Sequence, residues 1–217
     1  MTDVVIVDAG LGNLRSVEKS VVRAAAECGK ADLHVQHSAD PDLIRKAGRI
    51  VVPGQGGFRD CAAVFAGELG EAVREQLQRG TPYFGICLGL QVLFESSEEA
   101  PGAGLGWFEG HVARLQGAPA TDDSAAIKVP HMGWNQLQIP GELHPYLAKA
   151  GGAGSWFYFV HSFHAVPKDS GLVVAQVDYG PNHVTAAVAK DHVFATQFHP
   201  EKSQAAGLQL LEAFLAA

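Results

Sequence analysis

A cysteine between two glycines gives the clearest chemical signal in the sequence. Cys87 lies at the centre of Gly85–Gly89, which reads Gly-Ile-Cys-Leu-Gly between an apolar run and residues that favour a helix. Strand, sharp turn and helix in this order are typical of a nucleophile elbow, here with Cys in place of Ser. The glycines would relieve crowding at a strained turn, and the helix N-terminus would favour a thiolate. A buried core cysteine remains the alternative on this motif alone.

A catalytic cysteine needs a base, and the base needs a group that orients it. The segment Gln197–Glu201 reads Gln-Phe-His-Pro-Glu and follows the last expected strand. In extended backbone, residues i and i+2 point to the same side, so His199 and Glu201 could share a face, with Pro200 closing the strand. Glu201 could then fix the tautomer of His199 and leave the other ring nitrogen for Cys87. A strand-end histidine beside a surface glutamate is the structural alternative.

An oxyanion site is the third requirement of such chemistry. The segment Pro53–Gly57 reads Pro-Gly-Gln-Gly-Gly and is expected between a strand and a helix. Glycine-rich backbone around Gly54 and Gln55 can direct N–H groups at a developing oxyanion. The N–H of Leu88, directly after the cysteine, would be the second donor.

The elements around these segments predict an α/β fold. Apolar runs at Val4–Val7, 33–35, 50–52 and before Cys87 read as strands, and helical spacing between them gives a β-α alternation that is typical of a doubly wound parallel sheet. Gly67 should break the helical pattern of residues 62–77. After Ser96 strand-like runs predominate, at 112–115, 128–139, 156–160, 173–177, 184–189 and 193–198. Lys190-Asp191 should form a turn, and Ser203 could cap a last helix over 204–215. We expect one domain over residues 1–217, with an open, mostly parallel mixed sheet and helices on both faces.

Length and composition exclude several classes of protein. With 217 residues, 47% hydrophobic and 18% charged, the chain can bury a full core, which argues against disorder. No apolar run approaches the roughly 18 residues of a membrane span, and no basic segment indicates a secretory signal. The net charge of −7 without a basic run argues against nucleic acid as a partner. Three cysteines without metal-like spacing indicate free thiols, so we expect a cytoplasmic protein with no membrane partner.

Other motifs are weaker. Residues 10–12 read Gly-Leu-Gly after the first strand but lack the third glycine of a dinucleotide fingerprint. His161 and His164 would face opposite sides of a strand, and no carboxylate or cysteine completes a ligand set, so no metal and no cofactor are expected. Cys28 and Cys61 lie in apolar helical patterns and are expected to be packing residues. The aromatic run of residues 157–159 is expected in the core.

The strongest of these motifs resemble those of a known family. The elbow with Gln91, together with the His-Pro-Glu segment, resembles the triad-type (class I) glutamine amidotransferases, which have a flavodoxin-like sheet, and Pro53-Gly54-x-Gly56 resembles their oxyanion strand. Stretches 10–16, 130–135 and 158–163 resemble one branch, the glutaminase subunits of imidazole glycerol phosphate synthase in histidine biosynthesis. Gln55 departs from the usual aliphatic residue of the family, and Phe163 stands where Tyr is frequent.

The resemblance implies a reaction and a substrate. Cys87 would attack the side-chain amide of glutamine, His199 would protonate the leaving ammonia, and the glutamyl thioester would be hydrolysed. By position, the resemblance implies a glutamine pocket made by Gly54, Gly56, Leu88, Gln91, His161 and Ser162. A glutaminase subunit of another synthase, of the anthranilate or pyridoxal phosphate type, and a non-catalytic relative of the fold are the alternatives.

The resemblance also implies a partner. The motifs occupy the chain and leave no room for a synthase domain, so a second polypeptide should receive the ammonia. In the family this is the barrel-shaped (β/α) cyclase subunit, which forms a heterodimer with the glutaminase. It converts a phosphoribulosyl-formimino imidazole carboxamide nucleotide into imidazole glycerol phosphate and aminoimidazole carboxamide ribotide. The interface candidates are Asn13, Met132, Trp134 and Lys202, the last able to pair with a partner carboxylate.

Overall fold

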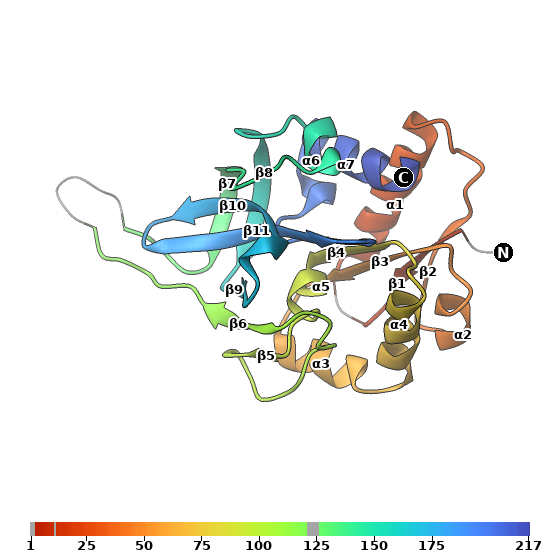
Figure 1. The fold of residues 1–217 in the computed structure, drawn as a ribbon, viewed down its shortest axis with the longest axis horizontal. Helices are drawn as coiled ribbons and strands as arrows, with labels where there is room; N and C mark the ends of the chain where they lie inside the picture. Colours follow the sequence, from red (N-terminus) through yellow and green to blue (C-terminus); the bar gives the residue numbers. More distant parts are fainter. Residues whose placement is uncertain (1–2, 11, 121–125) are drawn as a thin grey trace.

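A seven-stranded sheet runs through the computed structural model, which describes residues 3–10, 12–120 and 126–217 (Figure 1). In spatial order its strands are β10 (Val173–Tyr179), β11 (Asn182–Lys190), β12 (Val193–Thr196), β4 (Tyr83–Cys87), β3 (Arg49–Gly54), β1 (Val4–Val7) and β2 (Val35–Ser38). The strands from β12 to β2 are parallel, whereas β11 and β10 are antiparallel additions. The order β2-β1-β3-β4-β12 matches the flavodoxin-like order, so the expected mostly parallel mixed sheet is confirmed.

Helices cover both faces of this sheet, as the sequence predicted (Figure 1). One face carries α2 (Pro41–Ile44), α3 (Phe58–Phe65) and α4 (Glu68–Gln78), and the other carries α1 (Leu14–Glu27), α6 (Pro145–Lys149) and α7 (Gln204–Ala216). Alternate residues of β1 divide between the two cores: Val5 and Val7 face the first, Val4 and Ile6 the second. All four are fully buried, because a parallel strand with helices on both sides has no solvent face.

The N-terminal half follows the sequence closely. Gly67 separates α3 from α4 and is the N-cap residue of α4, which confirms the predicted break. The strand expected over 33–35 begins only at Val35. The helix expected through about Phe94 is shorter and comprises only Leu88–Gln91 (α5). The N–H groups of Leu93 and Phe94 bond the carbonyls three residues earlier, as in a 3-10 turn. Residue 11 of the 10–16 motif and residues 121–125 of an expected loop lie outside the described residues.

Smaller sheets lie beside the carboxyl edge. β5 (Ser96–Ser97), β6 (Gly110–Arg114) and β9 (Phe163–Pro167) form one, and β7 (His131–Gln136) pairs antiparallel with β8 (Trp156–His161) to form another. The sequence did not predict β9, and β7 is shorter than the expected 128–139. Short 3-10 turns follow at η1 (Ser170–Leu172) and η2 (Pro200–Lys202). Among residues 3–10, 12–120 and 126–217, no helix meets the length and hydrophobicity that a transmembrane span requires.

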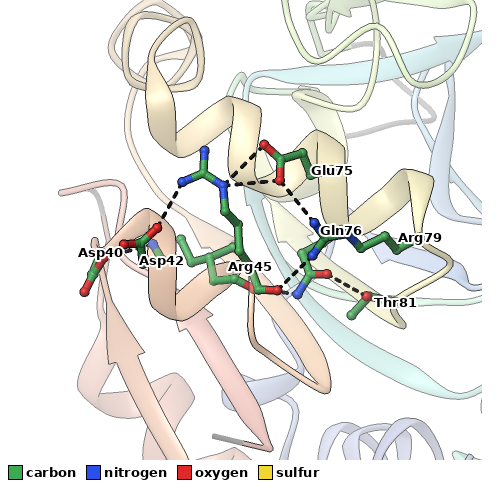
Figure 2. A network of polar contacts seen from close by, with 8 residues as sticks. Asp40, Asp42, Arg45, Glu75, Gln76, Arg79 and Thr81 are labelled. Atoms are coloured by element: carbon green, nitrogen blue, oxygen red, sulfur yellow. Dashed lines mark hydrogen bonds and ion pairs between the residues drawn. The ribbon is translucent and has the colours of Figure 1, made fainter. Parts of the chain in front are cut away.

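A buried glutamine ties α4 to the end of α2 (Figure 2). The Nε2 of Gln76 donates to the carbonyls of Ile44 at 2.5 Å and Ala47 at 3.0 Å, and its Oε1 accepts from Thr81 at 2.9 Å. The neighbouring Arg45 contacts Glu75, but this pair is partly open to solvent and contributes little. The side-chain amide therefore serves the carbonyl of Ala47 and gives the carbonyl of Ile44 a second donor beside the N–H of Ala47.

Gln76→Met is expected to destabilise the fold without touching the proposed chemistry. Methionine keeps the shape but removes the amide donor from both carbonyls; that of Ile44 keeps the N–H of Ala47, whereas that of Ala47 loses its Gln76 bond. A buried polar group left unsatisfied costs about 1–3 kcal/mol. We expect a loss of that order in the free energy of unfolding, measured by urea denaturation. An unchanged unfolding midpoint would show that water or backbone movement replaces the amide.

Candidate active site

Cys87 occupies a strained turn at the end of β4. It has φ 55° and ψ −103° and is the N-cap residue of α5. A positive φ is rare for a residue other than glycine and is enriched at functional sites. A Cβ at Gly85 would lie 2.5 Å from the carbonyl oxygen of Gly89, and one at Gly89 would overlap the carbonyl oxygen of Val52. The predicted order of strand, sharp turn and helix is confirmed, and both flanking glycines are needed for close backbone packing.

His199 and Glu201 form a buried pair. His199 Nδ1 lies 2.8 Å from Glu201 Oε1, and both side chains are 1% exposed. Burial alone would lower the pKa of His199, but the charge of the Cys87 thiolate and polar contacts with Cys87 and Glu201 raise it to about 9. Among the described residues, Nε2 of His199 has no partner in good hydrogen-bond geometry. The charge of the nearby sulfur is the largest of the effects that raise this pKa, and Glu201 adds to it on the Nδ1 side of the ring.

The backbone around His199 differs from the predicted strand. β12 ends at Thr196, and Glu201 lies in the 3-10 turn η2, so the two side chains meet across a turn and do not share a strand face. The turn is held by β8: His199 N–H donates to the carbonyl of Tyr158 at 2.9 Å, and the Ser203 hydroxyl donates to the carbonyl of His199 at 2.6 Å. Ser203 also accepts from Tyr158 N–H at 3.0 Å. Its hydroxyl therefore fixes the histidine and does not cap α7, as the sequence had suggested.

A cavity of about 390 Å³ opens beside the cysteine. Its lining residues are Gln55, Gly56, Cys87, Leu88, Gln91, Glu99, Pro130, Val160, His161, Ser162, Phe163 and Lys202. All the predicted pocket residues except Gly54 are in this set. Gly54 packs behind Leu88 instead, where a Cβ would lie 2.6 Å from the Cβ of Leu88. The volume admits a small amino acid.

Gln91 is held inside the molecule. Its side chain is 3% exposed, and Nε2 donates to the carbonyl of Phe163 at 2.9 Å and to Oε1 of Gln197 at 3.0 Å. A solvent-facing glutamine is therefore excluded. Because both amide protons have protein acceptors, Oε1 is the atom of Gln91 that remains for a ligand in the cavity.

His161 pairs with His131, not with His164. Its Nε2 lies 3.0 Å from His131 Nδ1, and its Nδ1 lies 2.9 Å from the carbonyl of Phe163. Burial lowers the pKa of His161 to about 3 and that of His131 to about 4, so both are neutral. The carbonyl can only accept, so Nδ1 of His161 carries the proton and Nε2 accepts from His131. Both ring nitrogens are occupied, and among the described residues no three potential metal ligands cluster.

The other cysteines and the two phenylalanines of the aromatic run pack in or against the core. Cys61 is 1% exposed, and burial raises its pKa to about 12, which suits a packing residue. Cys28 is half-buried with its thiol 3.5 Å from the carbonyl of Ala25. Phe157 and Phe159 are fully buried, as expected. Tyr158 between them is only partly buried, and its ring lies beside Trp134 and Lys202, so the prediction is wrong for that residue.

Sequence reasoning missed two side chains at this site. Glu99 lines the cavity, and its Oε2 accepts from the N–H of Phe58 at the start of α3 at 2.7 Å. Gln197 is fully buried, and its Nε2 lies 3.5 Å from Cys87 Sγ. Gln197 stands two residues before His199, so its place in that segment could have identified it. Nothing in the sequence around Glu99 gave a comparable signal.

The four interface candidates lie near the same edge. Met132 and Trp134 on β7 are 63% and 42% exposed. The Trp134 ring and Lys202 Nζ lie 6.0 Å and 5.9 Å from the ring of Tyr158, the residue whose backbone holds His199. Asn13, exposed at the start of α1, borders a small void shared with His199 and Glu201. Trp134 and Lys202 thus contact the residue whose carbonyl bonds His199, and Asn13 lies close to the His199–Glu201 pair itself.

Comparison with known proteins identifies the family. The family model described as glutamine amidotransferase class-I matches residues 5–217. Imidazole glycerol phosphate synthase subunit HisH of Methylococcus capsulatus is 44% identical over 216 residues, covering 99% of this chain and 96% of its own. The protein of the same name from Chromobacterium violaceum is 46% identical over 218 residues, covering 98% of this chain and 97% of its own. A structure of PurLQS from Thermotoga maritima, 17% identical with TM-score 0.71 and covering 100% of this chain and 99% of that chain, supports the fold alone. The chain belongs to the class-I glutamine amidotransferase family and, within it, to the imidazole glycerol phosphate synthase subunit HisH family.

Proposed function

We propose that Cys87, His199 and Glu201 carry out the hydrolysis of glutamine in a single amidotransferase domain over residues 1–217. The observation that carries this proposal is the cysteine at positive φ beside the cavity, with the buried His199–Glu201 pair next to it. The thiolate attacks the side-chain amide carbon, and protonated His199 gives its proton to the nitrogen that leaves as ammonia. His199 then accepts a proton from the water that cleaves the thioester, and glutamate is released. Glu201 stabilises the imidazolium and fixes its orientation.

The oxyanion donors are proposed at two adjacent strand ends. Gly54 and Cys87 are register partners on β3 and β4, so the Gly54–Gln55 peptide comes level with the nucleophile. The N–H of Gln55 and the N–H of Leu88 would then approach the same oxygen from two sides. One such donor is worth about 3–4 kcal/mol in the transition state.

The substrate pocket is proposed to hold the amino-acid end of glutamine. Gly56, Gln91, His161 and Ser162 line the cavity with the cysteine. The carboxylate of Glu99 suits the α-ammonium group, and Oε1 of Gln91 can accept a further N–H bond from the substrate. His161 is proposed to shape the wall rather than to transfer protons, since both of its ring nitrogens are already bonded.

The partner is proposed to be the cyclase subunit of imidazole glycerol phosphate synthase, a β/α barrel that forms a heterodimer with this chain in the cytoplasm. The similar proteins are named as subunits of that synthase, and three free thiols suit a reducing compartment. Asn13, Met132, Trp134 and Lys202 are the proposed contacts. The cyclase would use the ammonia to form imidazole glycerol phosphate and aminoimidazole carboxamide ribotide.

The test is ammonia release from glutamine by the chain alone, with the cyclase, and with the cyclase plus its nucleotide ligand. We expect slow hydrolysis alone and activation of about 10²–10³-fold in the full complex, the range that one oxyanion donor supplies. Equal rates in the three states would contradict partner control. No hydrolysis in any state would overturn the proposed enzyme activity itself.

Gln55→Pro is expected to flatten this activation. Gly54 and Gly56 lie on either side of Gln55 and let this backbone rotate at little steric cost, so either the N–H of Gln55 or the carbonyl of Gly54 can face the oxyanion. The loop that carries Asn13 packs against this peptide, since a Cβ at Gly12 would lie 3.3 Å from Gln55 N. Proline has no N–H, so the partner would have no donor to bring into place. Normal activation of Gln55→Pro in the same three-state assay would locate the control elsewhere.

A further inference from the structure

Two buried amides link a main-chain carbonyl to the sulfur of Cys87. Gln91 Nε2 donates to the carbonyl of Phe163 at 2.9 Å and to Gln197 Oε1 at 3.0 Å. Gln197 Nε2 in turn lies 3.5 Å from Cys87 Sγ. The two glutamines are 3% and 0% exposed, so both side-chain amides are buried. The chain approaches the sulfur independently of the His199–Glu201 pair.

The direction of this chain is fixed by its far end. The carbonyl of Phe163 can only accept, so Gln91 must turn its amide nitrogen toward it. The second proton on that nitrogen then faces Gln197, which must present its oxygen. The nitrogen of Gln197 is left facing Cys87. The assignment of both side-chain amides follows from one unambiguous acceptor and needs no observed hydrogen.

We propose that Gln197 is a positioning residue that holds the Cys87 sulfur and favours its thiolate form, with its own orientation set by Gln91 and the carbonyl of Phe163. This inference rests on the proposed role of Cys87 as nucleophile. An N–H donor stabilises a charged acceptor more than a neutral one. The amide does not titrate, so this donor is present at every pH, whereas the charge on His199 is not.

The arrangement divides two tasks between two residues. His199 must move a proton to the leaving nitrogen and cannot remain bonded to the sulfur throughout the reaction. Its Nε2 is the atom without an aligned partner among the described residues. Gln197 keeps its hydrogen bond to the sulfur while His199 transfers a proton. Gln91, which lines the cavity that receives the substrate, bonds Gln197 and so links the cavity to this contact.

The experiment measures alkylation of Cys87 by iodoacetamide in the full chain across roughly pH 5 to 10, with the modified peptide quantified by mass spectrometry. In Gln197→Met the donor is lost at similar volume. We expect alkylation about tenfold slower well below the pH midpoint of the wild-type profile and an unchanged rate at high pH, equivalent to a rise of about one unit in that midpoint. A structural defect alone would change the rate equally at all pH values.

Gln91→Met provides the second variant, in case Gln197→Met does not fold. It leaves Gln197 in place but removes the donor that sets its orientation, so the same midpoint should rise by a smaller amount. Gln76→Met is the matched control: it removes another buried glutamine, held by carbonyls far from the cavity, and should leave the pH profile of Cys87 unchanged.

The outcomes separate this inference from the proposed function. A wild-type pH profile in Gln197→Met, or a rate reduced equally at all pH values, overturns the role of Gln197. Ammonia release by Cys87→Ala would instead overturn the nucleophile assignment on which the inference rests. Loss of ammonia release in Cys87→Ala together with a raised midpoint in Gln197→Met is the result expected.

Discussion

Cys87→Ala is expected to abolish glutamine hydrolysis and to leave the fold and the partner contact intact. Removal of the nucleophile from a triad that acts as a unit costs about 10⁶-fold in rate. Alanine carries the same Cβ as cysteine, so the backbone at φ 55° gains no new clash. Cys87 is 6% exposed and the side chain is small, so the change removes one sulfur from the cavity wall and little packing.

The measurement compares ammonia release with synthase activity supported by ammonium salt. In the complex with the cyclase, Cys87→Ala should lose the glutamine-dependent reaction but keep the ammonium-dependent one, because only the source of ammonia is lost. Cys61→Ala is the matched control, since Cys61 is also buried but packs in the core between the sheet and helices α3 and α4. Substantial glutaminase activity of Cys87→Ala with the partner present would sink the nucleophile assignment.

Local sequence patterns were sufficient to predict the turn at Cys87 and the parallel sheet. The glycines beside Cys87 and the apolar run before it are neighbours in the chain, and their spacing alone predicts a strand followed by a tight turn. Likewise Val4–Val7 is buried on both faces, which a continuous apolar run predicts without knowledge of its neighbours.

The errors arose where distant segments decide the structure. The chain leaves β12 at Thr196 because His199 bonds the backbone of β8, and no local pattern contains that contact. Glu99 bonds Phe58 although the two are 41 residues apart in the sequence, and Gln197 contacts Cys87 at a separation of 110 residues. The triad was predicted from its residue patterns and the pocket from family resemblance, but the contact between Gln197 and the sulfur is seen only in the tertiary structure.

The family also decides between the alternatives that the sequence left open. Relatives 44–46% identical over nearly the whole chain are named as subunits of imidazole glycerol phosphate synthase. They therefore support this subunit and not a glutaminase of the anthranilate or pyridoxal phosphate type. An intact cysteine, histidine and glutamate in contact geometry is also poorly explained by a non-catalytic relative.

Glu201→Gln is expected to reduce glutamine hydrolysis strongly without abolishing it. The loss can reach about 10⁴-fold where an amide selects the wrong tautomer of the histidine. A cysteine depends less on its base than a serine does, because its thiolate forms more readily. The rate is measured with the cyclase and its ligand bound. An unchanged rate would mean that another group orients His199.

The same variant should change the pH dependence of stability. The pKa of His199 is raised from 6.5 to about 9 in the folded chain, so folding favours the protonated ring. That stabilisation is fully present below about pH 6.5 and is lost as the pH rises through about 9. Glu201→Gln removes one of the groups that raise this pKa, so the fall in the free energy of unfolding between these pH values should shrink.

Urea denaturation of wild type and Glu201→Gln at about pH 6 and about pH 9.5 measures this difference. The matched control is Glu18→Gln, which alters a partly exposed glutamate paired with His37 and leaves the buried pair untouched. Since both side chains of the His199–Glu201 pair are 1% exposed, solvent screens their interaction little, and the effect should persist at high salt. An equal pH dependence in wild type and Glu201→Gln would show that the carboxylate does not hold the proton on His199, and the catalytic role proposed for Glu201 would lose its electrostatic basis.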